Sequence, residues 1–406
     1  MNPTQTVFSS AAILLPPFSS DPESMKRWAV IACDQFTSEP AYWKRCRDLA
    51  CGHPSAYDYI MPEAYLGTEE EAVHAAEIEK AMASFDERIM RRIDGFLYLE
   101  RTLPDGSLRR GIVGRIDLEA YDYRPGSSSP IRATEATVLE RIPPRTKIRA
   151  SAAIELPHIL VLVDDRVGLM EKAASLAREI AYDFDLMAGG GHARGTAIEG
   201  QDALLLSEKI AEYESSRAGL VYAMGDGNHS LAAARAHWEN VKRETGDMDH
   251  PARYALCEIT ALGEESLVFE PIYRLLKNCD PDDVFTELLK VSAESGEQRV
   301  EIIAGERGQE LSFARSTHAL TVGTLQDWID RYLAAHPGVI CDYIHGEESL
   351  RGLASAPGNV GFLFEGMDKS ALFPYVESHG TLPRKTFSMG DAAGKRYYIE
   401  CRRIRR

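Results

Sequence analysis

A turn between a predicted strand and a predicted helix carries the residues best suited to chemistry. Residues 219–223 are apolar and typical of a buried strand, and residues 231–246 return apolar side chains to one face of a helix. A helix start presents unpaired backbone N–H groups and the positive end of the helix dipole, which attract phosphate or carboxylate. The turn between them, Asp226-Gly227-Asn228-His229-Ser230, therefore predicts a binding site for a small anion.

The residue types in this turn indicate separate roles. Gly227 permits a positive φ angle or a close approach of ligand to backbone. We expect His229 to donate to a phosphoryl oxygen and Asp226 to bind a metal ion or orient a nucleophile, so both are candidate catalytic residues. The alternative is an ordinary helix N-cap formed by Asp226 or Asn228, with the glycines serving only the turn.

A basic segment at residues 132–149 stands out in a chain that is otherwise acidic. Guanidinium groups suit bidentate binding of phosphate or carboxylate, so Arg141 and Arg145 are candidate anion-binding residues. Glu135 lies among these cations and is a candidate base or metal ligand. Pro143 and Pro144 are expected to break any helix between the two arginines. A solvated basic face with surface ion pairs would explain the same pattern.

Three further stretches place polar residues near the ends of predicted elements, and we expect them to contribute to substrate or phosphate binding. A helix cap is the alternative for the second stretch and an ordinary surface strand for the third. The residues are Asp34 and Gln35 after the strand at 28–33, His345 and Glu347 before a helix, and Arg384, Lys385 and Thr386 after a proline.

Composition and charge disfavour several classes of protein. The net charge of −16 disfavours a nucleic-acid partner, because phosphate backbones require dense Lys and Arg. No apolar run approaches the roughly 18 to 20 residues of a membrane span, and no basic leader opens the chain, so a cytoplasmic protein is expected. Seven cysteines form no C-x-x-C pair, and H-E-x-x-H and G-x-G-x-x-G motifs are absent from the sequence. We therefore expect neither zinc, NAD nor haem.

The order of predicted elements favours an α+β fold with mixed sheets. Residues 95–119 form two strand patterns around a Pro-Asp-Gly turn, which predicts a hairpin. Residues 169–187 are predicted to form one helix that ends at the glycines 189–191. The chain reads as one unit of 406 residues, with a tentative subdivision into an N-terminal α+β region at 1–210 and a region at 211–406 that carries the Asp-Gly-Asn-His turn.

These motifs together resemble a widespread prokaryotic family, domain-of-unknown-function family 1015. The resemblance runs nearly end to end and rests on six stretches in one order. They are WAVIACDQFTSEPAYW at 28–43, RATEATVLERIPPR at 132–145, GDGNHSLAAA at 225–234, FEPIYRLL at 269–276, DYIHGE at 342–347 and LPRKTFSMG at 382–390.

The turn at 226–229 is also similar to the Asp-Gly-His-His-Arg turn of the ParB/sulfiredoxin-like fold, which includes nucleotide-binding ParB domains, sulfiredoxin and a free-serine kinase. The resemblance implies a core of that fold and phosphate contacts from the backbone of Gly227 and Asn228 and the side chain of His229. Many relatives have Arg where this chain has Ser230, so cations near 141–149 or 384–385 would have to replace that phosphate clamp. The turn lacks a cysteine, so sulfiredoxin chemistry is not expected.

We therefore expect an enzyme of phosphoryl transfer or phosphate-ester hydrolysis on a small, amino-acid-related metabolite, as in a serine kinase, with ATP or ADP and Mg²⁺. The turn would hold phosphate, and Arg141, Arg145 and Lys385 would neutralise developing charge. Glu135 or Asp226 would position a hydroxyl or bind the metal. The alternative is a non-catalytic sensor or interaction protein that binds a nucleotide or anion in the same place. The sequence makes no prediction of oligomeric state.

Overall fold

The computed structural model describes residues 6–406, which divide into two compact units. Unit 1 consists of the chain up to Leu267 together with Asp391–Arg406, and unit 2 is Val268–Gly390. The tentative boundary after residue 210 falls inside helix α6 (Gly200–Ser215), which belongs wholly to unit 1. The two compact units differ from the predicted subdivision because the last residues of the chain return to unit 1 and pair with its strands.

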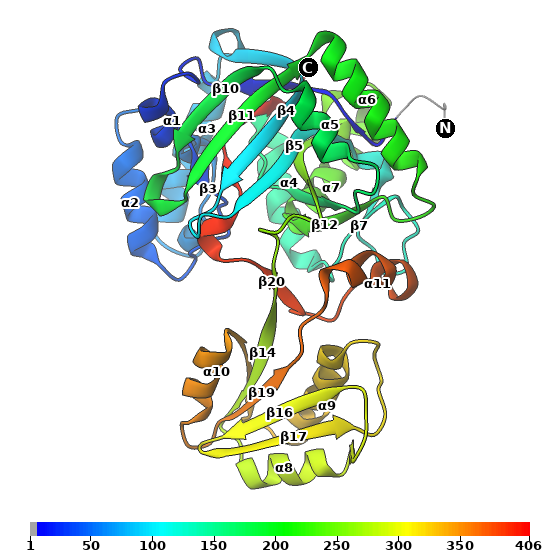
Figure 1. Cartoon of the computed structure of the whole chain (residues 1–406). Helices are drawn as coiled ribbons and strands as arrows, with labels where there is room; N and C mark the ends of the chain where they lie inside the picture. Colours follow the sequence, from blue (N-terminus) through cyan, green and yellow to red (C-terminus); the bar gives the residue numbers. More distant parts are fainter. Residues whose placement is uncertain (1–5) are drawn as a thin grey trace. The chain divides into compact units, whose positions relative to one another are not determined.

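A mixed sheet forms the centre of unit 1 (Figure 1). Its longest strands are the predicted hairpin, β4 (Arg91–Thr102) and β5 (Leu108–Asp117). Most neighbouring strands are antiparallel, but β13–β9, β12–β7 and β6–β7 are parallel, so the predicted α+β class is confirmed. The path through the sheet is β10-β11-β4-β5-β13-β9-β12-β7-β6, with β1 beside β5 and β2 beside β4.

The remaining strands of unit 1 are short, and two pairs lie outside the main sheet. The strands of the sheet are β1 (Phe8–Ser9), β2 (Ala11–Leu15), β6 (Tyr121–Asp122), β7 (Ile131–Arg132), β9 (Leu160–Val163), β10 (Glu179–Asp185), β11 (His192–Glu199), β12 (Tyr222–Asp226) and β13 (Tyr254–Ala261). The separate pairs are β3 (Val30–Ile31) with β21 (Tyr397–Tyr398) and β8 (Ile154–Glu155) with β22 (Arg402–Arg403).

Both faces of the β4–β5 hairpin are buried. Successive side chains of a strand point to opposite faces, so Phe96 and Tyr98 join one apolar cluster and Leu97 and Leu99 another. The first cluster includes side chains of α5 (Leu169–Leu176) and α6, and the second those of α1 (Pro22–Trp28) and α2 (Pro40–Ala50), while α3 (Glu70–Ser84) packs near the second. Each fully buried apolar side chain contributes about 1.5–3 kcal/mol to stability.

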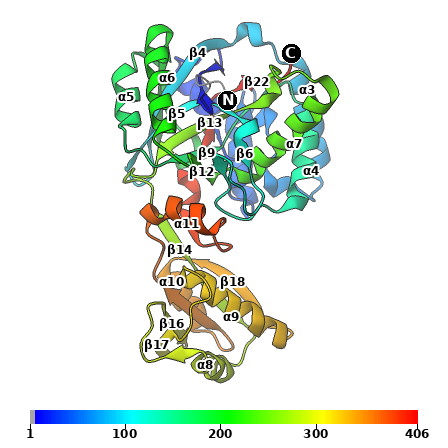
Figure 2. The ribbon, with the colours of Figure 1, turned by 90° about the vertical axis from the view of Figure 1, so that its right-hand side faces the viewer.

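Helices α7 (Asn228–Thr245) and α4 (Ile142–Ser151) pack against each other in unit 1 (Figure 2). Leu231, Ala234 and Trp238 recur on one face of α7 and are buried, as the helical pattern predicted. Pro143 and Pro144 do not break a helix before Arg145. They lie in the first turn of α4, where a missing N–H costs nothing.

The prediction of one helix over 169–187 is wrong in its second half. Helix α5 ends at Leu176, and β10 follows as an edge strand paired with β11. Tyr182 and Phe184 are buried while Asp183 and Asp185 are exposed, the alternation of a half-buried strand. The glycines at 189–191 consequently form the turn between β10 and β11 instead of capping a helix.

Unit 2 is a smaller sheet with helices on both faces (Figure 1). Leu276, Ile302 and Phe362 pack with α8 (Pro281–Leu289) and α9 (Thr321–Ala335), and the neighbouring residues of the same strands pack with α10 (Glu347–Ala354). The order is β15-β17-β16-β19-β14-β18, with β20 beside β14. The other elements are β14 (Phe269–Lys277), β15 (Ser292–Ala293), β16 (Arg299–Ala304), β17 (Arg307–Phe313), β18 (Ile340–His345), β19 (Val360–Phe364), β20 (Phe387–Met389) and α11 (Leu372–His379).

None of the helices in residues 6–406 combines the length and hydropathy needed to cross a bilayer.

His237 on α7 gives the fold a specific dependence on pH. Burial, followed by the nearby Arg149 cation, lowers the pKa of His237 to about 4, whereas an unfolded histidine titrates near 6.5. The unfolded chain therefore takes up this proton as the pH falls through 6.5 while the folded chain stays neutral until about 4. The contribution of His237 to the free energy of unfolding is complete above pH 6.5 and decreases below it. At pH 5 the loss from this group alone is about 2 kcal/mol.

Urea unfolding at pH 7 and pH 5 tests this expectation. His237→Gln should show a smaller loss of unfolding free energy between the two pH values than the unsubstituted protein. His53→Gln, which changes an exposed histidine, is the control and should retain the full loss. Equal pH dependence in both variants would contradict the assignment to His237.

Candidate anion-binding site

Helix α7 begins at a glycine in the left-handed region. Strand β12 ends at Asp226, and Gly227 takes the N-cap position with φ 76°. No side chain caps this helix, and the Asp226 Oδ1 instead accepts from the N–H of Gly227 at 2.8 Å. The alternative of an ordinary Asp or Asn cap is therefore not what the structure has. The first N–H groups of α7 need an acceptor that no capping side chain provides.

Three hydrogen bonds tie the basic segment to this helix start. Thr134 Oγ1 donates to the carbonyl of Met224 in β12 at 2.7 Å. The Asn228 amide donates to Thr137 Oγ1 at 2.8 Å, and the Val138 N–H donates to His229 Nε2 at 3.1 Å. The segment that leads to Arg141 is thus fastened along β12 and the first turn of α7.

The Asn228 side chain has a structural role. Its Oδ1 accepts from the Tyr121 hydroxyl at 2.7 Å while its amide nitrogen donates to Thr137, so both ends of the amide are used. A role of Asn228 in phosphate binding stays a prediction.

The cations of Arg141 and Arg145 both lower the pKa of His229. Arg141 occupies the N-cap position of α4 and is exposed, and half-buried Arg145 pairs with Glu63 and donates to the Arg141 carbonyl at 3.1 Å. Burial, followed by these two cations, lowers the pKa of His229, and Asp34 opposes the shift only in part. His229 is therefore neutral near pH 7. Because its Nε2 accepts from Val138, its proton lies on Nδ1, which is the donor available to a ligand.

Asp34 and Gln35 belong to the same group of residues. Asp34 is half-buried, and the Gln35 amide donates to its Oδ1 at 3.1 Å. Burial alone raises the pKa of Asp34. The interactions with His158, Gln35 and Lys395 outweigh burial, so the pKa lies below its ordinary value. Asp34 is a carboxylate at neutral pH.

His158 was not predicted from the sequence, and it links the segment of Asp34 to α7. Cys33 donates its N–H to the Tyr398 hydroxyl at 3.2 Å, and that hydroxyl lies 2.9 Å from His158 Nδ1. His158 Nε2 in turn lies 3.4 Å from Ser230 Oγ. His158 lies two residues before β9, and its neighbours in the sequence do not distinguish it from a core histidine.

Lys395 is the second residue that the sequence analysis missed. Its Nζ lies 3.3 Å from Asp226 Oδ2. The segment around it is held by buried arginines, because Arg109 donates to the Gly394 carbonyl at 3.1 Å and Arg396 pairs with Glu258 and Glu400. A lysine on a segment fixed in this way places a positive charge beside the turn.

Sequence comparison identifies the family. A family model described as "Protein of unknown function (DUF1015)" matches residues 15–399. The chain belongs to this family. The resemblance seen in the six sequence motifs is thereby confirmed, and the comparison with curated proteins gave no match.

Three solved structures are distantly similar to this DUF1015 chain. A free serine kinase in complex with AMP is 12% identical, with 72% of this chain and 90% of that chain covered and a TM-score of 0.37. SbnI with a C-terminal truncation from Staphylococcus aureus is 8% identical, with 72% and 87% covered and a TM-score of 0.38. A conserved hypothetical protein from Pyrococcus furiosus is 12% identical, with 72% and 94% covered and a TM-score of 0.35. A ParB/sulfiredoxin-like core stays a prediction for the DUF1015 chain.

Asp226 and Glu135 are the metal ligands predicted for this turn. Asp226 already shares its carboxylate between Lys395 and the Gly227 N–H, and Glu135 is half-buried in the segment fastened to β12. Within residues 6–406, no three His, Cys, Asp or Glu side chains are grouped as metal ligands. The roles of Asp226 and Glu135 as catalytic or metal-binding residues stay predictions.

The other two motifs of this DUF1015 chain lie in unit 2. Arg384 pairs with Asp330 at 2.6 Å, Lys385 is exposed with φ 54°, and Thr386 is buried. Buried Arg274 fixes this stretch by donating to the carbonyls of Arg384 and Lys385.

The stretch at 342–347 covers the end of β18, which pairs with β14, and the start of α10. His345 is exposed opposite Ile272, and Glu347 pairs with Arg351 in the first turn of α10. These contacts agree with the alternatives of a surface strand and a helix end, and the binding roles of these five residues stay predictions.

Proposed function

We propose that unit 1 binds a nucleotide or a phosphorylated small metabolite at the start of α7 and catalyses phosphoryl transfer or phosphate-ester hydrolysis. One observation carries this proposal. A helix start without a capping side chain lies among the cations of Arg141, Arg145 and Lys395 in a chain of net charge −16. An uncapped helix start and guanidinium groups are the features by which proteins bind phosphate.

In the proposed complex, phosphate oxygens accept from the backbone N–H groups at the first turn of α7. His229 donates from Nδ1, since its Nε2 is used by Val138. Arg141 and Arg145 stabilise the negative charge of the transferred phosphoryl group. These roles suit phosphoryl transfer, in which catalysis consists mainly of positioning the substrate and stabilising charge.

Asp34 is the group we assign to the attacking hydroxyl. It is ionised at neutral pH and interacts with His229, so its carboxylate can accept the hydrogen of a substrate alcohol or of water. A weak base suffices because the transition state of phosphoryl transfer is loose, with little bond formation to the attacking oxygen. Asp226 already forms an ion pair with Lys395, which favours Asp34 over Asp226 for this role.

Thermal-shift measurements with phosphorylated compounds test the binding step. AMP, ADP, ATP and phosphorylated metabolites such as phosphoserine are suitable probes, and a ligand at 100 times its Kd should stabilise the protein by about 2.7 kcal/mol. His229→Ala should reduce this stabilisation, because the donor at Nδ1 is lost. His53→Ala, at an exposed histidine, is the matched control and should respond as the unsubstituted protein does.

Release of inorganic phosphate, or transfer to an added alcohol, tests the catalytic step. Turnover that requires Asp34 would support the enzyme. Binding without turnover would instead support the alternative of a non-catalytic sensor. If no phosphorylated compound stabilises the protein, or if His229→Ala responds like the control, the proposal is wrong.

A further inference from the structure

A second concentration of positive charge lies in unit 1, outside the group of residues around α7. It is a cavity of about 700 Å³, within the range of small-molecule sites. Five of its eleven lining residues are arginines and two are acidic, so its side chains carry a net charge of about +3 in an acidic protein. The lining is Phe85, Asp86, Glu87, Arg88, Met90, Arg92, Ala153, Ile154, Arg403, Arg405 and Arg406.

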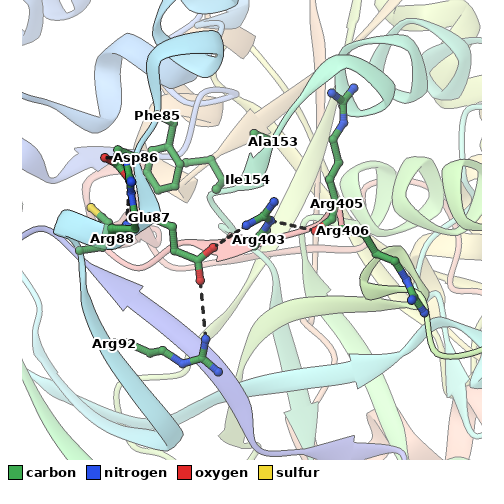
Figure 3. Close-up of a pocket in the computed structure, with 11 residues that line it drawn as sticks. Phe85, Asp86, Glu87, Arg88, Arg92, Ala153, Ile154, Arg403, Arg405 and Arg406 are labelled. Atoms are coloured by element: carbon green, nitrogen blue, oxygen red, sulfur yellow. Dashed lines mark hydrogen bonds and ion pairs between the residues drawn. The ribbon is translucent and has the colours of Figure 1, made fainter.

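Two of the arginines share one carboxylate. Figure 3 shows Glu87 between Arg403 and Arg92, at 3.1 Å from Arg403 Nη1 and 3.6 Å from Arg92 Nη1. The guanidinium groups of a strand β4 residue and a strand β22 residue therefore already meet on a single anion. Both arginine side chains are 53% exposed, so the pairing is accessible to a competing anion.

Displacing Glu87 costs little. Solvent weakens a partly exposed ion pair, so a ligand with more negative charge than one carboxylate can replace Glu87, whose side chain is 25% exposed. Arg405 adds a further cation, which donates to the backbone carbonyl of Ala150 at 2.5 Å. Arg88 is less available because it pairs with Asp86 through two nitrogens. Arg92 also pairs with Asp94 through Nε and Nη2, so its Nη1 is the nitrogen that faces Glu87 and the cavity.

The cavity also has an apolar side. Phe85, Met90 and Ile154 belong to a hydrophobic cluster with Leu14 and Cys401. Guanidinium groups beside an apolar surface suit a ligand that combines charged groups with an apolar body.

We propose that this cavity binds a small organic polyanion, with its phosphate or carboxylate groups on Arg92 and Arg403 and its apolar part against Phe85 and Ile154. The site is separate from the proposed phosphate site. Arg141 is at the start of α4 and Ala150, the acceptor of Arg405, is near its end, and this helix of 10 residues spans roughly 15 Å.

Calorimetric titration of the full chain at low salt tests the proposal, with tripolyphosphate, ATP and citrate as probes. Phosphate and carboxylate sources are distinguished by which probe binds more tightly. Replacing Arg92 and Arg403 together with glutamine should weaken binding by about 10²-fold or more, because two hydrogen bonds to charged groups are lost. Arg299→Gln, which removes an exposed arginine of unit 2, is the control and should bind as before.

Glu87→Gln provides a test that a damaged fold cannot imitate. Removing the competing carboxylate should tighten binding, whereas partial unfolding would weaken it. Absence of binding by all three probes, or unchanged binding in the double variant, overturns the proposal. It is also overturned if His229→Ala abolishes all binding while the double variant retains it, a result that leaves the proposed function at α7 intact.

Discussion

Replacing Arg141 and Arg145 together with glutamine is expected to weaken phosphate binding at the start of α7 by about 10²- to 10⁴-fold. A hydrogen bond to a charged group contributes about 1.5–3 kcal/mol, so two such contacts account for roughly 3–6 kcal/mol of binding free energy. The same change should raise the pKa of His229, because both cations now lower it. Calorimetric titration with the best ligand from the thermal-shift screen measures the first effect. NMR titration of the His229 ring measures the second without any ligand.

Two control variants separate charge from structure in this experiment. Lys147→Gln removes an exposed cation from the same helix, α4, and should leave both measurements almost unchanged. Glu63→Gln breaks the ion pair of Arg145 but keeps its guanidinium group, so phosphate binding should be retained. Unchanged affinity in the double arginine variant, or an equal loss in Lys147→Gln, would contradict the role assigned to the two arginines.

The parts of the site that could be predicted from the sequence are those with local causes. A strand followed by Gly-Asp-Gly and then by a helical pattern specifies where a helix starts, and the structure starts α7 at Asn228. The basic segment was recognisable because its cations interrupt an acidic chain. The hairpin of β4 and β5 followed from a turn signal between two strand patterns.

The residues that were missed owe their positions to long-range contacts. Lys395 reaches Asp226 only because the chain returns to unit 1 after unit 2 and because Arg109 and Arg396 hold that segment. His158 contacts both Ser230 and Tyr398, and Tyr398 is 240 residues further along the chain. Neither contact can be predicted from the spacing of neighbouring residues in the sequence.

The wrong helix over 169–187 has a related cause. The stretch after Leu176 contains alanine and acidic residues that are compatible with a helix, but β11 offers a partner strand along its whole length. Pairing with β11 and burial of Tyr182 and Phe184 decide the outcome, so tertiary contacts override local preference. The prolines before Arg145 show the reverse case, in which a residue expected to end a helix starts one.

Gly227→Ala is expected to lower the free energy of unfolding by about 2–5 kcal/mol and to weaken phosphate binding. A residue with a Cβ atom in the left-handed region costs about 1–2 kcal/mol, and Gly227 has φ 76°. Its added Cβ would also lie 3.0 Å from Ile159 Cα and 3.1 Å from Ile159 Cγ1, and such overpacking costs a further 1–3 kcal/mol or so. Relief of the contact requires a shift of the first turn of α7, which moves the N–H groups that we propose bind phosphate.

Gly246→Ala at the other end of the same helix separates the two contributions. Gly246 has φ 66°, but nothing lies within 4 Å of the Cβ that it would gain. This variant should therefore lose only about 1–2 kcal/mol and should bind phosphorylated ligands normally. Urea unfolding and the thermal-shift response measure both quantities on both variants. If the two variants lose equal stability, the close approach of Gly227 to Ile159 is unimportant. If Gly227→Ala binds ligands as tightly as Gly246→Ala, the first turn of α7 is not where phosphate is held.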